Sequence, residues 1–277
     1  MNAINLAPPG LKSYSSLVQG FRKIGSHKES GLQVVGKKKQ LNTVGQILEK
    51  INAPPDHSVL IGTCLNGLPI FMEFSDPSIG SILVVCDQGC GKTHQLQVMA
   101  ESAARLSPPG TLQIAVLSLN PGEWTNLLNQ PFSAHINKGV FVWYEPKAQK
   151  MIETLTGLAE KRRQGQGLDA NILFFLDDLQ ALEDLNWETQ VNLRWLLEYG
   201  PQSNIWPIAT LQTKAFAEMR FWVETFKPKI TGSIVDPAFQ TCAEGLDLAT
   251  NSFLEPGEFS VNLGNRRLQY RLPMLGD

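Results

Sequence analysis

The sequence of 277 residues lacks any long, uninterrupted hydrophobic run. Its longest apolar stretches, residues 172–176 and 81–86, are far shorter than the roughly 20 residues that cross a bilayer. The first ten residues also lack the basic stretch, apolar run and small-residue cleavage site of a secretory signal. With 43% hydrophobic and 18% charged residues, the chain is expected to form a soluble, cytoplasmic domain with a substantial core.

Cysteine is scarce, and the four histidines form no cluster. Of the cysteines at positions 64, 86, 90 and 242, only Cys86 and Cys90 are close in sequence. A zinc site would show a second Cys pair or a His pair at ligand spacing, and the sequence has neither. We therefore expect reduced thiols without a metal, with redox control through Cys86 and Cys90 as the alternative.

Basic residues are concentrated at the N-terminal end of the chain. Residues 1–50 contain eight Lys or Arg and two acids, a charge of +6, so the formal charge of −2 leaves −8 for residues 51–277. A cationic arm can bind nucleic acid by releasing counterions. The run Lys37–Lys39 has no flanking aromatics for base stacking, so a solvated leader or a docking strap is the competing interpretation.

Short apolar runs alternate with helix-length amphipathic segments through the middle of the chain, the pattern of a parallel sheet with crossover helices. Two hairpins flank this core, because Asn66-Gly67 and Gly264-Asn265 each separate two β-favouring runs. We predict an α/β domain over residues 55–277 and a basic N-terminal extension over residues 1–54, with a short helix near 43–51. The expected strands are 58–64, 68–74, 81–86, 112–119, 139–144, 171–177, 204–210, 257–263 and 266–272, and the other helices are 92–106, 146–163, 187–198 and 214–225.

The strongest functional signal lies in Cys86-Asp87-Gln88-Gly89-Cys90-Gly91-Lys92-Thr93. A phosphate-binding turn needs a strand that ends at the ligand, glycines that let backbone N–H groups converge, and a helix that starts at once. All three are present, so Lys92 is expected to reach the β and γ phosphates of ATP, and the Thr93 hydroxyl to bind Mg²⁺. The predicted nucleotide-binding residues are Asp87, Gln88, Gly89, Cys90, Gly91, Lys92, Thr93 and His94.

Two residues of this turn depart from the pattern G-x-x-x-x-G-K-[ST]. Cys86 occupies the position of the first glycine, and Asp87 brings a carboxylate close to the expected phosphates. That carboxylate weakens phosphate binding unless its side chain points away or is paired. The sequence therefore predicts nucleotide binding and leaves the rate of hydrolysis open.

Two later strands also end in polar residues. The apolar run 172–176 leads into Asp177, the expected Mg²⁺ ligand, and Asp178, which would orient or deprotonate the attacking water. An Asp reaches about one methylene less far than the Glu that more often fills this role. Gln212 ends the next strand and would hydrogen-bond the γ phosphate or the water, unless it is an ordinary loop residue. The predicted catalytic residues are thus Lys92, Asp178 and Gln212.

Taken together, these stretches resemble the FtsK/HerA superfamily of RecA-like P-loop motor ATPases, over about residues 68–272. Beyond the turn and the acidic strand, the resemblance rests on Gly67-Leu68-Pro69-Ile70, Glu160-Lys161-Arg162-Arg163, Ile208-Ala209-Thr210-Leu211-Gln212 and Leu254-Glu255-Pro256-Gly257-Glu258-Phe259. It implies a RecA-like P-loop core with a mostly parallel central sheet, flanking helices, and β-hairpins before and after the core. It also implies Mg²⁺ and ATP at the interfaces of a hexameric ring that encloses double-stranded DNA.

The resemblance fails at the arginine that commonly precedes the Gln-bearing strand, because residues 199–203 contain none. Arg194, about two turns earlier, is the candidate arginine finger, with Arg220, Arg266 and Arg267 as others. Since such a finger can contribute 10³ to 10⁵ in rate, its absence would leave a slow ATPase. Three hypotheses follow: a DNA-translocating motor, a nucleotide-gated interaction protein with little turnover, and an AAA-like remodeller of a protein partner.

Overall fold

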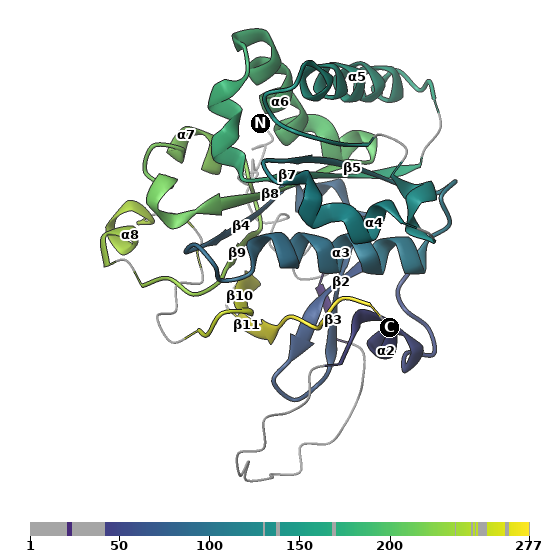
Figure 1. Ribbon diagram of the computed structural model, residues 1–277, viewed down its shortest axis with the longest axis vertical. Helices are drawn as coiled ribbons and strands as arrows, with labels where there is room; N and C mark the ends of the chain where they lie inside the picture. The colour runs from purple at the N-terminus through teal and green to yellow at the C-terminus, as the bar shows by residue number, and fades with distance from the viewer. Residues whose placement is uncertain are drawn as a thin grey trace, which may run out of the picture.

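The computed structural model describes residues 21–23, 42–129, 131–136, 139–167, 170–235, 237–244, 246, 248, 254–263 and 266–276. These residues form one large sheet with helices on both faces (Figure 1). Most of the predicted N-terminal extension, including Lys37–Lys39, lies outside the described residues, as do Gly264 and Asn265 of the second predicted turn. Within the described part of the chain, no helix is long and apolar enough to cross a membrane.

Eleven strands form the sheet, in the order β1-β3-β2-β11-β10-β9-β4-β8-β7-β5-β6. One half is parallel and contains β9 (Lys229–Thr231), β4 (Ile82–Cys86), β8 (Ile205–Gln212), β7 (Asn171–Asp177), β5 (Leu112–Ser118) and β6 (Val140–Phe141). The other half is antiparallel and contains β1 (Phe21–Lys23), β3 (Pro69–Glu73), β2 (Ser58–Cys64), β11 (Arg266–Arg271) and β10 (Glu258–Leu263). The predicted RecA-like core with a central parallel sheet and flanking hairpins is confirmed, and both hairpins extend that same sheet.

The parallel strands are buried on both faces, which explains their near-continuous apolar sequences. In β4, Ile82 and Val84 face a core that includes helix α3 (Lys92–Leu106). Leu83 and Val85 face the opposite core, which is formed with α5 (Pro146–Arg163) and α6 (Trp187–Tyr199). The strand is therefore fixed from both sides up to Cys86, where the phosphate-binding turn begins.

Most predicted elements occur where the sequence places them, and α3 and α5 match to the residue. The helix predicted over residues 214–225 is wrong, since this stretch contains only η6 (Thr213–Ala215) and α7 (Arg220–Val223), joined by turns. Its aromatic and β-branched residues favour helix weakly, and burial of Phe216, Met219 and Val223 fixes the turns instead. The remaining short elements are η1 (Pro77–Ile79), η2 (Pro121–Trp124), α4 (Thr125–Leu128), η3 (Phe132–His135), η4 (Leu179–Asp184), η5 (Gly200–Ser203) and α8 (Pro237–Cys242).

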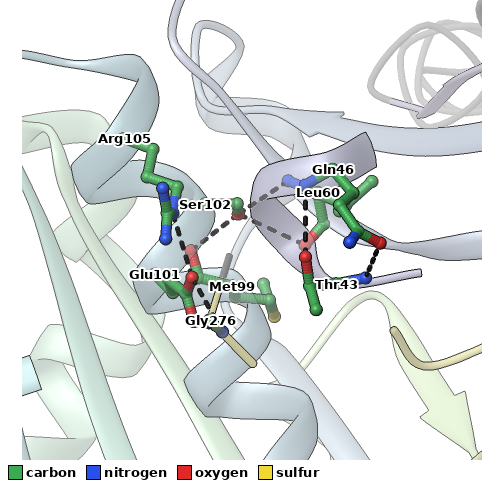
Figure 2. A network of polar contacts seen from close by, with 8 residues as sticks. All are labelled: Thr43, Gln46, Leu60, Met99, Glu101, Ser102, Arg105 and Gly276. Atoms are coloured by element: carbon green, nitrogen blue, oxygen red, sulfur yellow. Dashed lines mark hydrogen bonds and ion pairs between the residues drawn. The ribbon is translucent and has the colours of Figure 1, made fainter. Parts of the chain in front are cut away.

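Helix α2 (Val44–Glu49) packs against the core, although it lies within the predicted extension. Its start is a capping box in which Gln46 N donates to Thr43 Oγ1 and Thr43 N donates to Gln46 Oε1, both at 3.2 Å (Figure 2). The C-terminal segment pairs with it, as Val44 N donates to Met274 O at 2.9 Å. Helix α2 and the C-terminal segment therefore lie side by side.

Polar residues of α3 hold the C-terminal segment and strand β2 in place (Figure 2). The buried Glu101 carboxylate accepts a hydrogen bond from Gly276 N at 3.1 Å and pairs with Arg105 at 2.9 Å. The next residue, Ser102, accepts a hydrogen bond at its Oγ from Leu60 N of β2 at 2.9 Å. Since α3 begins at Lys92, these contacts anchor the helix whose first turn belongs to the candidate site.

Candidate nucleotide-binding site

A cavity of about 360 Å³ opens where β4, β5, β7 and β8 end. The carboxyl ends of parallel strands meet at one edge of a sheet, where α/β proteins bind their ligands. Three separate sequence motifs, the glycine-rich turn, Asp177-Asp178 and Gln212, therefore meet in one place. The cavity is lined by Gln88, Gly89, Gly91, Lys92, Thr93, His94, Ser118, Leu119, Asn120, Glu123, Asp177, Asp178, Thr210 and Gln212.

The glycine-rich turn has the backbone that a phosphate cradle requires. Gly89 and Gly91 have φ values of 81° and 104°, in the left-handed region that favours glycine. Helix α3 starts directly after Gly91, so its unpaired N–H groups and positive dipole end face the cavity. The turn is thus arranged to bind an anion.

Lys92 folds back over the turn. Its Nζ donates to the carbonyl oxygens of Cys86 at 3.1 Å and Asp87 at 2.9 Å. Burial lowers the pKa of Lys92, while the charges of Asp178, Asp177 and Asp87 act in the opposite direction. An anionic ligand in the cavity would supply the close negative charge that this ammonium group lacks.

The Asp87 carboxylate is paired on the far side of the turn. Its Oδ2 accepts a hydrogen bond from Val235 N at 2.8 Å, and its Oδ1 accepts one from the Thr213 hydroxyl. Asp87 is not among the residues that line the cavity. These hydrogen bonds hold the Asp87 carboxylate out of the cavity lining, and they join the turn to the segments that follow β8 and β9.

Thr93 and Asp177 lie together as a magnesium site would require. Thr93 Oγ1 lies 3.1 Å from Asp177 Oδ1, which also accepts a hydrogen bond from Thr210, while Ser118 donates to Oδ2. Burial raises the pKa of Asp177, and the hydroxyl donors lower it in part. The described residues contain no group of three or more His, Cys, Asp or Glu suited to a metal. A hydroxyl and one carboxylate suit Mg²⁺ that arrives with phosphate oxygens.

Asp178 and Gln212 form a second polar pair on the cavity wall. Gln212 Nε2 donates to Asp178 Oδ2 at 3.1 Å, and Gln180 N donates to Asp178 Oδ1 at 3.3 Å. Asp178 has a left-handed backbone with φ 66°, and its N–H donates to Thr210 Oγ1 at 2.7 Å. Gln212 Oε1 is buried without a hydrogen-bond partner among the described residues. That oxygen therefore lacks a donor, which a ligand or a water beside it would supply.

Cys86 and Cys90 form a disulfide across the turn. The expectation of reduced thiols is wrong for this pair, because the turn brings the two Cα atoms to 6.4 Å, whereas Cys64 and Cys242 are not in a disulfide. Cys86 is fully buried beside Gly232, where an added Cβ would lie 2.9 Å from Cys86 Cβ. Cys86 thus fits at the position of the first glycine because Gly232, on the neighbouring segment, has no side chain to occupy that space.

The disulfide predicts a count of reactive thiols. Protein unfolded in denaturant without reductant should react with two equivalents of an alkylating reagent, and with four after reduction, because two of the four cysteines are bonded. The mass of the intact chain gives both numbers. The double variant Cys86→Ser/Cys90→Ser should show two in either condition. Four reactive thiols in the unreduced wild-type protein would contradict the bond.

The other predicted site residues have local contacts. His94 Nε2 lies 2.8 Å from Pro273 O, and Cys90 is buried behind the cavity wall. Arg194 is not a cavity-lining residue within the described chain: it pairs with Glu198 at 3.1 Å, and its guanidinium stacks 3.6 Å from the centre of the Phe221 ring. The resemblance implies an arginine finger that reaches the site of a neighbouring subunit. The cavity of a single chain does not test such a contact, so the role of Arg194 as the finger stays a prediction.

Sequence reasoning missed the wall that follows β5. Ser118, Leu119, Asn120 and Glu123 line the cavity, and none was predicted as a site residue. The signal was present, because Ser118, Asn120 and Glu123 are polar residues just after an apolar strand, as Asp177 and Asp178 are. The same criterion applied to every parallel strand would have found them.

Comparison with known proteins gives matches in structure alone. No protein-family model and no curated protein sequence matches the chain. The fold is similar to ATPases 2 and 3 of EccC from Thermomonospora curvata, solved with a signal sequence peptide, at a TM-score of 0.68 and 14% identity, covering 91% of this chain and 46% of that one. ATPases 2 and 3 of EssC from Geobacillus thermodenitrificans give 0.66 and 15% identity, covering 88% and 49%. The pCW3 conjugation coupling protein TcpA, solved as a monomer with ATPγS, gives 0.61 and 16%, covering 96% and 81%.

The fold is that of the RecA-like P-loop ATPases. Within that class it is the fold of the FtsK/HerA-type domains, as the resemblance in the sequence predicted. The chain spans about half the length of the EccC and EssC chains that it matches. The activity and partners of this chain are therefore inferred from its own site.

Proposed function

We propose that this protein binds Mg²⁺ and ATP in the cavity, hydrolyses the ATP, and couples hydrolysis to the movement of double-stranded DNA through a homo-oligomeric, hexameric ring. One observation carries the nucleotide assignment: Thr93, in the first turn of α3, lies 3.1 Å from the Asp177 carboxylate beside a glycine-rich turn. A structural strand-to-helix turn does not need a hydroxyl and a carboxylate beside its glycines, and a metal site made of protein ligands alone does not need a glycine-rich turn. Its parts suit one ligand, a triphosphate with its cation.

In this proposal each residue has a role that follows from its position. The N–H groups of residues 88–93 bind phosphate oxygens, whereas Asp87 N donates to Ser233 O, and Lys92 moves from its two loop carbonyls to the β and γ phosphates. Thr93 and Asp177 hold Mg²⁺, which when bound neutralises charge on the phosphates. Asp178 and Gln212, which both line the cavity, would face the γ phosphate and the attacking water. Arg194 or another arginine would complete the site from a neighbouring subunit.

DNA is the proposed substrate for two reasons. Residues 1–50 carry a charge of +6, which favours a polyanion. TcpA, which is similar over 96% of this chain, is a conjugation coupling protein. A protein substrate is the second candidate, because the EccC domains with a similar fold were solved with a signal sequence peptide.

ATP turnover measured with and without double-stranded DNA, alongside the particle mass in solution, tests the proposal. We expect DNA to raise turnover, and the increase to fall as salt rises from about 50 to 200 mM, since phosphate contacts depend on counterion release. The particle mass should be a multiple of the chain mass of 30.6 kDa when ATP is present.

The alternative outcomes separate the competing functions. Tight ATP binding without turnover above the Lys92→Ala background would contradict hydrolysis and favour a nucleotide-gated switch. Turnover with no DNA affinity even at low salt, where electrostatic binding is strongest, would contradict the DNA assignment and favour a protein substrate.

A further inference from the structure

Three acids line the cavity among the described residues: Glu123, Asp177 and Asp178. The carboxylates of the last two are already engaged in hydrogen bonds. Asp177 accepts hydrogen bonds from three hydroxyls and Asp178 accepts two from Gln180 N and Gln212. Glu123 makes no side-chain hydrogen bond or ion pair within the described part of the chain, and its side chain is exposed on the cavity wall.

The backbone of Glu123 is nevertheless fixed. Gln97 Nε2, on α3, donates to Glu123 O at 2.6 Å, and Glu123 N donates to Asn120 O at 3.0 Å. Its neighbour Trp124 is fully buried, with its ring 5.7 Å from that of Phe175 in β7. The carboxylate is therefore attached to a rigid support between α3, which carries Lys92, and β7, which carries Asp177.

Trp124 ties this support to the magnesium side of the site. Its ring packs against Phe175 of β7, the strand that ends at Asp177, and Nε1 makes no hydrogen bond among the described residues. Glu123 thus lies one residue from a side chain that packs against the strand that carries Asp177. A Glu side chain also reaches about one methylene further than Asp178, whose oxygens are held by two donors.

We propose that Glu123 is the carboxylate that orients the attacking water and accepts its proton, and that Asp178 instead positions Gln212. This inference rests on the proposed ATP hydrolysis. The water oxygen forms a bond to the γ phosphorus, while the bond from that phosphorus to the β–γ bridging oxygen breaks and its electron pair leaves with ADP. One water proton passes to Glu123 Oε. Gln212 Oε1 accepts a hydrogen bond from the second water proton.

Glu123→Gln and Asp178→Asn separate the two carboxylates. Loss of a general base typically costs 10²- to 10⁴-fold, so Glu123→Gln should lower kcat by at least about 10²-fold while the Kd for a fluorescent ATP analogue with Mg²⁺ changes less than about threefold. Affinity for ADP with aluminium fluoride, a mimic of the transferring phosphoryl group, should fall at least about tenfold. Asp178→Asn should cost less than about tenfold in kcat, because Asn still offers an acceptor to Gln212.

The matched control is Glu218→Gln, an exposed acid that does not line the cavity, which should behave as wild type. Glu123→Asp should recover part of the lost kcat, since it restores the base one methylene short. A Glu123→Gln protein with kcat within threefold of wild type, or a loss of 10²-fold or more in Asp178→Asn alone, would overturn this assignment and leave hydrolysis intact. A wild-type protein that binds ATP without turnover would overturn both proposals together.

Discussion

Lys92→Ala should weaken the binding of Mg·ATP by about 10²- to 10³-fold and bring turnover to background. Lys92 is the cation that lines the cavity at the phosphate-binding turn, and a charge-assisted contact to phosphate is shorter and stronger than a neutral one. At about 1.4 kcal/mol per factor of ten, the expected loss is about 3–4 kcal/mol, the range found when a buried charge partner is removed. Titration of a fluorescent ATP analogue measures the binding.

The Lys92→Ala protein should lose its affinity for Mg·ATP and still be folded. Burial lowers the pKa of Lys92, so above that lowered pKa and up to 10.5 the unfolded chain binds more protons than the folded one. Stability then rises with pH across this window, and below it the charged ammonium group opposes folding. Removing the group should therefore leave the Tm without nucleotide unchanged or higher. A lower Tm in Lys92→Ala would mean that weak binding reflects unfolding instead.

Lys214→Ala is the matched control. Lys214 is exposed and lies close enough to lower the pKa of Lys92, yet it does not line the cavity. Its removal should change ATP affinity less than about threefold. An equal loss in both variants would indicate a general electrostatic effect and contradict a specific contact between Lys92 and phosphate.

The features that could be predicted from the sequence are those with a local cause. A buried strand, a glycine-rich turn and an amphipathic helix follow one another between residues 81 and 106, and each is specified by its own residues. The start of α3 at Lys92 is fixed by Gly91, whose φ of 104° ends the turn. The meeting of Asp177 with this turn follows from the rule that parallel strands end at one edge.

Features that depend on distant parts of the chain could not be predicted. The carboxylate of Asp87 accepts hydrogen bonds from Thr213 and Val235, which are 126 and 148 residues away in sequence. Strand β9 has only three residues and forms because β4 and β10 lie on either side of it, which no periodicity in so short a segment reveals. The disulfide depends on space beside Gly232. The Glu123 carboxylate is free of hydrogen bonds only because no other described residue folds close enough to pair with it.

Asp177→Asn should remove the Mg²⁺-dependent part of ATP binding and, at the same time, stabilise the protein without ligand. Burial raises the pKa of Asp177 above its ordinary value of 3.8, so between that value and the raised pKa the folded chain binds more protons than the unfolded one. Stability therefore falls as pH rises through this window, and at neutral pH the ionised carboxylate opposes folding. An uncharged Asn of the same shape should raise the Tm by on the order of 2 °C, the shift that about 1 kcal/mol produces in a chain of this size.

Bound Mg²⁺ would reverse the effect of the ionised carboxylate on stability, because a cation at Thr93 and Asp177 stabilises the charged form. At 100 times the Kd a ligand adds about 2.7 kcal/mol to stability, so Mg·ATP should raise the Tm of the wild-type protein by about 5–10 °C. In Asp177→Asn, ATP with Mg²⁺ should give no larger shift than ATP with EDTA. The exposed acid Asp184 serves as the control, since Asp184→Asn should keep both the wild-type Tm and its Mg²⁺-dependent shift. An Asp177→Asn protein with a lower Tm without ligand would contradict the claim that the ionised carboxylate opposes folding. An Asp177→Asn protein that keeps the Mg²⁺-dependent shift would contradict its role as the metal ligand.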